Sequence, residues 1–334
     1  MSYALATISN PSAGLTDFSL IVDLSRMPAS WWAAVNTSDG TRGRVYKGDG
    51  TTRLAADWID FDDTEETGLL RVLWSGTLAT TGTQQLWIEP PLAANATVAA
   101  DNTYGSDNAY DSSWVGYWPS GGGDDRTSSG NDGTANGGVT VGGATGKIGA
   151  ATDFDGTNDY VSVGYSTANI DYTWSLWANP DTVRKTWILN TDVAGGGWAI
   201  AGFNDDGELR VYSGNTNYRW IGNSGDITDS WQRFDVVHTG DVSNVYKNAS
   251  ELTASSNNSQ SVHAGDAIYI GGEWTPSGWN YFDGLLQEIQ IHSTVRSSDW
   301  ISYEYDQTND QATFWGTWSW AVDTVPMPQY IYGE

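Results

Sequence analysis

The chain has 334 residues and no cysteine, and its 41 acidic and 15 basic residues give a formal net charge of −26. The absence of cysteine excludes disulfides, thiol catalysis and cysteine-ligated metals. The negative charge repels nucleic-acid phosphates, so we expect no nucleic-acid partner, and the lack of any run of about 18 apolar residues predicts no membrane insertion.

Length and aromatic content predict two folded domains. A chain of 334 residues exceeds what one hydrophobic core usually organises. Its 19 tryptophans supply large apolar side chains for cores that no disulfide supports. The first ten residues have neither a basic region nor a continuous apolar stretch, so we expect no signal peptide at this start.

The N-terminal part of the chain repeats apolar residues with a period of two. Phe18, Leu20 and Val22 alternate with Ser19 and Asp23, and residues 70–74 and 85–89 continue the pattern. Such alternation between Gly- and Asp-rich turns is typical of half-buried antiparallel strands. We therefore predict an all-β fold, with a first β-sandwich domain over residues 1–111.

Residues 112–320 are predicted to form a second all-β domain. Gly121–Gly149 is rich in glycine and small polar residues. It fits either a flexible linker or a long ordered loop, and we favour the ordered loop because a strand motif follows. From residue 153 onward, regularly spaced strands with Gly-rich turns predict a sandwich or jelly roll.

The last 40 residues contain two exceptions to the strand pattern. Ser297–Asp310 has the periodicity of a short helix, with Ser297 or Ser298 as its N-cap. Residues 321–334 contain two prolines, which oppose a helix or a central strand. We predict an extended C-terminal arm there, which either docks on a neighbouring subunit or is frayed.

Four motifs in the second domain, in the same order, resemble those of laminin-G-like, concanavalin A-like domains. They are Ala151–Val161 (ATDFDGTNDYV), Trp174–Pro180 (WSLWANP), Val245–Leu252 (VYKNASEL) and Phe282–Ile291 (FDGLLQEIQI). The resemblance covers about residues 112–316 and implies a concanavalin A-like jelly roll, a fold shared by lectins and β-glucanases.

Two segments of the first domain resemble an uncharacterised β-domain. They are Thr41–Gly50 and Thr103–Asp111. That domain often precedes laminin-G-like modules in bacterial and phage surface proteins. The resemblance implies a surface setting and no established activity.

A laminarinase-type hydrolase is the sharpest enzymatic hypothesis. Those enzymes place several carboxylates on one strand face, and alternation puts Glu288, Gln290 and His292 on one face here. A retaining glycosidase needs two carboxylates about 5–5.5 Å apart, and Gln290 and His292 supply none. We therefore predict no enzymatic activity.

Alternation also gives a candidate sugar-binding face. Trp177 and Tyr269 point away from the apolar residues beside them, and Glu288, Gln290 and His292 could hydrogen-bond sugar hydroxyls. The competing interpretation is that both aromatic rings are buried under a loop or a neighbouring chain. A second group of candidates lies in turn-rich segments, where a hydrophobic lid or subunit contact is the alternative: Trp198, Trp274 and Trp279.

An acidic turn suggests calcium as a cofactor. Asp153, Asp155, Asn158 and Asp159 offer hard oxygen ligands around a glycine. Some laminin-G-like relatives bind calcium at a sheet rim. The family's aspartate in the last motif is Gln287 here, and solvated turn carboxylates are the alternative.

The resemblances together predict a non-catalytic surface protein. We expect a phage virion protein, which decorates the head or forms part of a tail or fibre and has adhesion to cell-surface glycans as a further role. Its partners are then other virion proteins or copies of itself. The alternatives are a secreted carbohydrate-binding adhesin on a bacterial surface and a purely architectural assembly protein.

Overall fold

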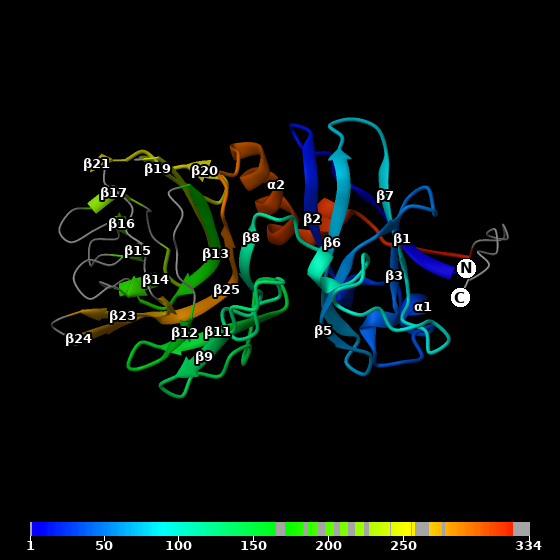
Figure 1. Cartoon of the computed structure of the whole chain (residues 1–334), viewed down its shortest axis with the longest axis horizontal. Coiled ribbons are helices and arrows are strands. Elements are labelled where there is room, and N and C mark those ends of the chain that lie inside the picture. Colours follow the sequence, from blue (N-terminus) through cyan, green and yellow to red (C-terminus); the bar gives the residue numbers. More distant parts are fainter. Residues whose placement is uncertain are drawn as a thin grey trace. The chain divides into compact units, whose positions relative to one another are not determined.

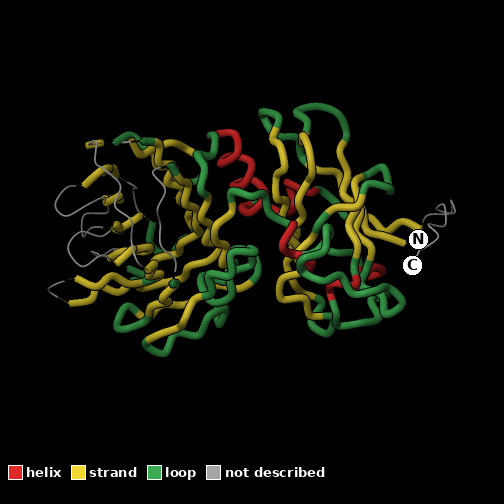
Figure 2. Tube along the Cα trace, in the orientation of Figure 1, coloured by secondary structure: helices red, strands yellow, loops and turns green. Residues whose placement is uncertain are grey.

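The computed structural model describes the chain from residue 2 to residue 322 with several gaps. The described residues are 2–164, 171–182, 186–192, 198–203, 208–212, 218–223, 227–240, 242–254, 256–257, 267–275 and 278–322. Strands dominate this part of the chain (Figure 2). The colours of Figure 1 run along the chain from the N-terminus in blue to the C-terminus in red.

The chain divides into two compact units. Unit 1 comprises residues 1–111 and 306–334, and unit 2 comprises residues 112–305. The predicted boundary between residues 111 and 112 coincides with this division. The predicted end of the second domain at residue 320 does not, because the chain returns to unit 1 after residue 305, within the helix Ser298–Asn309 (α2).

Unit 1 contains two antiparallel sheets. Five strands run in the order β26-β1-β7-β3-β4 and three in the order β2-β6-β5. The first sheet consists of Ser319–Val322 (β26), Ser2–Ile8 (β1), Gln84–Glu89 (β7), Arg44–Lys47 (β3) and Arg53–Leu54 (β4). The second consists of Leu15–Asp23 (β2), Thr67–Leu78 (β6) and Ala56–Asp62 (β5). Short helical turns are Leu24–Arg26 (η1), Ala29–Trp32 (α1), Gly40–Arg42 (η2) and Ser106–Asn108 (η3).

The C-terminal return of the chain completes unit 1. Strand β26 pairs with β1, so that Ala321 lies opposite Tyr3. The prediction of an extended arm began at residue 321, but residues 321 and 322 belong to this strand, and residues 323–334 lie outside the described residues. A strand forms here because β1 would otherwise be the edge of the sheet, with backbone groups that lack a partner.

Glutamine side chains from the same segment bind the free edge of β2. The backbone N–H of Ile21 donates to Gln307 Oε1 at 2.9 Å, and Gln311 Nε2 donates to the Ile21 carbonyl at 3.1 Å. Gln311 Oε1 also accepts from the N–H of Asp23 at 3.0 Å. The indole of Trp315 donates to the Ile21 carbonyl at 2.9 Å. Side-chain amides thus replace a neighbouring strand along β2.

In the middle of β2 and β6 both strand faces are buried, which differs from the predicted half-burial. Ser19 is 3% exposed and Arg71 is fully buried. The Arg71 guanidinium donates from Nη1 to the Ser19 carbonyl at 3.2 Å. The alternation correctly gave the apolar face, but it could not show that other parts of the chain cover the polar face.

Unit 2 contains two large antiparallel sheets and a two-stranded hairpin. The first sheet runs β10-β11-β25-β13-β18-β19-β20, and β8 pairs with the other end of β25. Its strands are Ala144–Thr145 (β10), Ala150–Asp155 (β11), Asp283–His292 (β25), Tyr172–Pro180 (β13), Gln232–Thr239 (β18), Val242–Lys247 (β19), Ser250–Glu251 (β20) and Trp114–Trp118 (β8).

The second sheet of unit 2 runs β21-β17-β16-β15-β14-β22-β12-β9. Its strands are Ser256–Asn257 (β21), Tyr218–Asn223 (β17), Glu208–Tyr212 (β16), Trp198–Phe203 (β15), Thr186–Asp192 (β14), Ala267–Ile270 (β22), Tyr160–Val163 (β12) and Gly133–Asn136 (β9). Gly272–Thr275 (β23) and Gly278–Tyr281 (β24) form the hairpin.

One hydrophobic core lies between the two sheets of unit 2. Trp174 and Leu176 enter it from the first sheet, and Val161 and Ile270 enter it from the second. These side chains alternate with residues that face outward, as in other sandwiches. The prediction of an all-β fold with a C-terminal sandwich is confirmed.

The predicted helix near the C-terminus is α2, Ser298–Asn309, followed by α3, Gln311–Trp315. The hydroxyl of Ser297 accepts from the N–H of Trp300 at 3.2 Å, which makes Ser297 the N-cap. The Gly121–Gly149 segment is described throughout and includes β9 and β10, in agreement with the ordered loop that we favoured.

Candidate functional site

The outer face of the first sheet in unit 2 is closed. Trp177 was expected to face a sugar, but it is 1% exposed. Its indole stacks on the Tyr305 ring of α2, with ring centroids 5.7 Å apart and planes at 22°. The Lys147 ammonium lies 5.6 Å from the centre of the indole. The expectation of a sugar-facing Trp177 is therefore corrected, because a helix covers the strand face that carries it.

Glu288 occupies a β-bulge. Ser175 and Trp177 are two residues apart on β13, but their partners Gln290 and Gln287 are three apart on β25, so β25 has one extra residue. Glu288 has a left-handed backbone with φ 51° at this point. Its backbone N–H donates to the Pro119 carbonyl at 2.8 Å.

The carboxylate of Glu288 belongs to a buried polar layer. Tyr117 Oη donates to Glu288 Oε1 at 2.8 Å, and Glu288 is fully buried. Gln290 Nε2 donates to Glu304 Oε1 on α2 at 2.8 Å. Both Gln290 and Glu304 are fully buried. Glu304 is thus an additional carboxylate near the strand, but it holds an amide under the helix and does not line an open groove.

His292 is enclosed in the same layer. Arg296 Nη2 lies 3.1 Å from His292 Nδ1, which acts as an acceptor, and the other ring nitrogen lies 3.4 Å from Gln290 Oε1. The indole rings of Trp114 and Trp300 flank the imidazole edge-on, at centroid distances of 4.5 and 4.9 Å. Because His292 is fully buried, the expectation that Glu288, Gln290 and His292 bind sugar hydroxyls on an open face is also corrected.

An ion pair completes the buried layer. Arg233 Nη2 and Asp235 Oδ1 are 3.0 Å apart, and both side chains are fully buried. Burial raises the pKa of Asp235, whereas the neighbouring Arg233 lowers it, and burial dominates. The layer links strands β13, β18 and β25 to helix α2.

Tyr269 lies on the other sheet, in a different environment. It is half-buried on β22, and the residues beside it, Ile268 and Ile270, are in the core. Its ring packs against Tyr160 of β12 at a centroid distance of 5.9 Å and an angle of 63°. Tyr160 in turn lies 6.5 Å from Tyr281, at the end of β24.

We call this surface the tyrosine patch and define it as Tyr160, Tyr269 and Tyr281. All three rings are half-buried, so each leaves part of its surface to solvent. Burial, followed by the proximity of the Tyr160 phenol, raises the pKa of Tyr281. Three aromatic rings from three strands therefore converge on the outer face of the second sheet.

Polar side chains border the tyrosine patch. Ser162 lies directly opposite Tyr269 in the β12–β22 ladder, and Asn136 lies opposite Tyr160 in the β12–β9 ladder. Asn136 Nδ2 donates to Ser162 Oγ at 3.2 Å. The sequence analysis missed Tyr160 and its neighbours, although the alternation of Tyr160 and Ser162 with Val161 and Val163 indicated their outward orientation.

The three tryptophans that were predicted in turn-rich segments lie on strands β15, β23 and β24. Trp274 and Trp279 are direct partners in the β23–β24 ladder, and Trp198 lies opposite Thr191 in the β14–β15 ladder. The side chains of these three tryptophans lie outside the described residues. Their role in recognition remains a prediction.

The predicted calcium ligands form a turn that is held by its own hydrogen bonds. Asp155 Oδ1 accepts from the N–H groups of Thr157 and Asn158 at 2.8 and 3.3 Å. Burial raises the pKa of Asp159, and the nearby charges of Asp155 and Asp153 add to the effect. Within the part of the chain that the structure describes, no group of three or more His, Asp or Glu side chains is arranged to hold a metal ion. Calcium binding remains a prediction.

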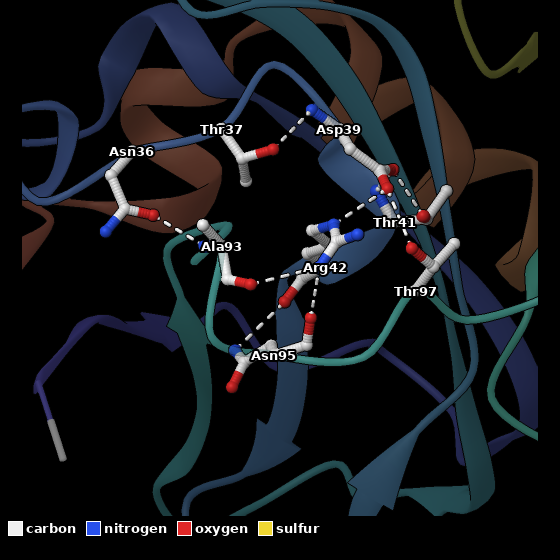
Figure 3. Close-up of polar contacts among 8 residues, drawn as sticks. All are labelled: Asn36, Thr37, Asp39, Thr41, Arg42, Ala93, Asn95 and Thr97. Atoms are coloured by element: carbon white, nitrogen blue, oxygen red, sulfur yellow. Dashed lines mark hydrogen bonds and ion pairs between the residues drawn. The ribbon is translucent and has the colours of Figure 1, made fainter.

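A polar cluster in unit 1 fixes the loop around η2. The Asp39 carboxylate caps this turn through the N–H of Thr41 and also accepts from the hydroxyls of Thr41 and Thr97 (Figure 3). Arg42 Nε donates to Asp39 Oδ2 at 3.1 Å, and its Nη1 donates to the Asn95 carbonyl at 2.6 Å. Burial opposes the charge of Asp39, but these hydrogen bonds prevail and lower its pKa. The cluster ties two loops together.

The comparisons with known proteins agree with this fold. Residues 155–302 match the family model described as the concanavalin A-like lectin/glucanases superfamily, which confirms the predicted C-terminal resemblance. A search of the curated proteins found no match. Among the described residues, no helix has both the length and the apolar character needed to cross a membrane.

Two solved structures illustrate the similarity. The receptor-binding domain of the botulinum neurotoxin C/D mosaic serotype aligns with 14% identity and a TM-score of 0.47, covering 58% of this chain and 51% of its own. Domain 4 of AbnA, an extracellular arabinanase from Geobacillus stearothermophilus solved with arabinotriose, aligns with 19% identity and a TM-score of 0.46, covering 57% and 97%. The chain thus spans about half of the neurotoxin domain.

Proposed function

We propose that unit 2 is a non-catalytic carbohydrate-binding module and that the tyrosine patch is its binding surface. The observation that carries the proposal is the convergence of Tyr160, Tyr269 and Tyr281 on one outer sheet face. A partly exposed aromatic ring offers its face to the C–H groups of a pyranose. Three such rings at different angles suit a short oligosaccharide better than a flat hydrophobic partner.

The border of the patch supports the same ligand class. The Asn136 amide lies directly opposite Tyr160 in the β9–β12 pair. The Ser162 hydroxyl lies directly opposite Tyr269 in the β12–β22 pair. Both can donate and accept hydrogen bonds, and sugar hydroxyls need partners of this kind. Sites that bind small molecules usually combine aromatic side chains with a few polar groups that orient the ligand.

A pair of variants at one position tests this proposal. Tyr269→Ala removes the ring, and Tyr269→Phe keeps it. A glycan array first identifies the best ligand, and calorimetry then measures its affinity for each variant. We expect Tyr269→Ala to weaken binding at least about tenfold, as for the loss of a central aromatic contact. Tyr269→Phe should retain most of the affinity. The proposal fails if no glycan binds at millimolar concentration, or if both variants bind like the parent protein.

A lack of catalysis is part of the proposal. Glu288 on β25, Asp235 on β18 and Glu304 on α2 are the acidic side chains of the buried layer, and all three are fully buried. Neither a sugar nor a nucleophilic water reaches an enclosed carboxylate. Release of reducing ends from β-glucans, abolished by Glu288→Gln, would contradict this part of the proposal.

For the setting of the module we propose a phage virion surface, with copies of this chain or other virion proteins as neighbours. Its support is the module order, a β-domain followed by a concanavalin A-like sandwich, which resembles surface proteins. Mass spectrometry of purified virions is the test. Detection of the chain at stoichiometric level supports the virion setting, whereas recovery from the bacterial surface without virions favours an adhesin.

A further inference from the structure

The outer face of the five-stranded sheet in unit 1 carries a second group of polar and aromatic side chains. The register places Arg44 of β3 opposite Glu89 of β7, and Tyr46 of β3 opposite Trp87 of β7. On the other side of Tyr46 lies Arg53 of β4. Residues two apart on a strand share a face, so these five side chains form one contiguous surface. We call it the Arg44–Arg53 face.

Several buried polar atoms of this face have no hydrogen-bond partner. Glu89 is 3% exposed, and its Oε2 is buried without a donor. Three further atoms are buried without an acceptor: the Nε atoms of Arg44 and Arg53 and the indole nitrogen of Trp87. Buried polar atoms are nearly always paired in folded proteins, so four such atoms on one face leave its hydrogen bonding incomplete among the described residues.

The charge of this face differs from that of the whole chain. The chain has only 15 basic residues against 41 acidic ones, yet two arginines here surround a single carboxylate. Burial raises the pKa of Glu89, whereas Arg44 and Arg53 lower it, and burial prevails. The face is therefore a local positive region that attracts an anion, and Arg guanidinium groups bind carboxylates in a fork geometry.

The two arginines are held in place by aromatic rings. The guanidinium of Arg53 lies 4.5 Å from the centre of the Tyr104 ring, and Arg44 hydrogen-bonds to the Tyr46 phenol. Arg44, Tyr46 and Arg53 are half-buried, so they also reach solvent. Positioned guanidinium groups lose less conformational entropy when they bind a ligand than mobile ones.

The aromatic part of the face is equally rigid. Trp87 stacks on Tyr3 with a centroid distance of 4.2 Å and an angle of 8°. The turn between β3 and β4 covers one edge of the indole, because a Cβ on Gly50 would come within 2.5 Å of it. The half-buried ring of Tyr46 stands beside Trp87 in the ladder and offers an apolar surface next to the arginines.

We propose that the Arg44–Arg53 face binds a carboxylated saccharide of the uronic-acid class. The ligand carboxylate would lie on the guanidinium groups of Arg44 and Arg53, a ring hydroxyl would donate to Glu89, and the sugar ring would contact Tyr46. This site lies in unit 1, whereas the tyrosine patch lies in unit 2. Failure of one proposal therefore does not contradict the other.

The experiment compares D-glucuronate with D-glucose, which has the same ring without the carboxylate. Binding to the full chain is followed by ligand-observed NMR at concentrations on the order of 10 mM, where weak monosaccharide binding becomes visible. We expect saturable binding of glucuronate, at least about tenfold stronger than that of glucose. Equal binding of the two sugars, or no binding of glucuronate, overturns the proposal.

Variants locate the site. Arg44→Gln and Arg53→Gln are each expected to weaken glucuronate binding at least about tenfold, because a two-point contact with the carboxylate is lost. Glu89→Gln keeps a hydrogen-bond acceptor and removes the repulsion, so it is expected to bind at least as well as the parent. Arg26→Gln removes a charge from unit 1 outside this face and serves as the matched control.

Two further outcomes complete the test. If acetate displaces glucuronate with equal affinity, the site recognises any carboxylate and the saccharide assignment is wrong. If Arg44→Gln lowers the melting temperature and Arg53→Gln and the control do not, the comparison is made with Arg53→Gln alone. Unchanged binding in that variant overturns the proposal.

Discussion

The indole of Trp177 and the phenol ring of Tyr305 stack with their centroids 5.7 Å apart, and this contact joins strand β13 to helix α2. Trp177 is 1% exposed, so Trp177→Ala should leave a large cavity. We expect a loss of about 3–5 kcal/mol in the free energy of unfolding, measured by urea denaturation. A double-mutant cycle with Tyr305→Ala should give a coupling of about 0.5–1.5 kcal/mol. Glycan binding by the folded variant should not change.

The Arg233–Asp235 pair predicts an asymmetric response to substitution. Both side chains are fully buried with a 3.0 Å contact. Asp235→Asn leaves the guanidinium without its counter-charge and should cost about 3–5 kcal/mol in the free energy of unfolding. The double variant Arg233→Met with Asp235→Leu removes both charges and should be less destabilised than the single one. A double variant that is less stable than Asp235→Asn would contradict this account.

The Asp39 cluster predicts a loss of stability in acid. The hydrogen bonds of Figure 3 lower the folded-state pKa of Asp39 below its ordinary value of 3.8. Its contribution is therefore fully present above the unfolded-state pKa and is lost as the pH falls through the lower folded-state value. Asp39→Asn should flatten the dependence of unfolding free energy on pH below about pH 4. Asp39→Ala should also lose the cap of η2, at a cost of about 1 kcal/mol.

Two glycines with left-handed backbones provide a matched comparison. A Cβ on Gly271, φ +76°, would lie 2.3 Å from the Phe154 ring, whereas a Cβ on Gly240, φ +55°, would meet nothing within 4 Å. Gly240→Ala should cost only the backbone strain of about 1–2 kcal/mol. Gly271→Ala should cost at least about 1 kcal/mol more, because the core must also move. Thermal unfolding of the two variants measures the difference, and equal melting temperatures would refute it.

The sequence predicted the strands of unit 2 well but misjudged which strand faces are open. Alternation correctly put Leu176 in the core and Trp177 on the opposite face, because a period of two is a local property. It could not show that α2 lies over Trp177, since that contact depends on residues more than 100 positions away. The helix itself was predicted, but the surface that it covers was not.

The bulge at Glu288 illustrates a second limit. Strict alternation described β25 as if each residue had one partner, but the left-handed backbone of Glu288 inserts an extra residue there. Only glycine, asparagine and aspartate commonly signal such a conformation in sequence. By contrast, the alternation of Tyr160 with Val161 did contain the signal for the tyrosine patch. The convergence with Tyr281 required the pairing of strands across the chain.

The glutamine contacts along β2 have a consequence for self-association. A strand edge with free N–H and C=O groups invites another copy to add its own strand, which is a common start of aggregation. Gln307 and Gln311 occupy those groups at Ile21, so the protection of an N-terminal strand depends on residues near the end of the chain. Removal of the segment that carries Gln307 and Gln311 would therefore expose the edge of β2 to strand addition by another copy, while the contacts within unit 2 would remain.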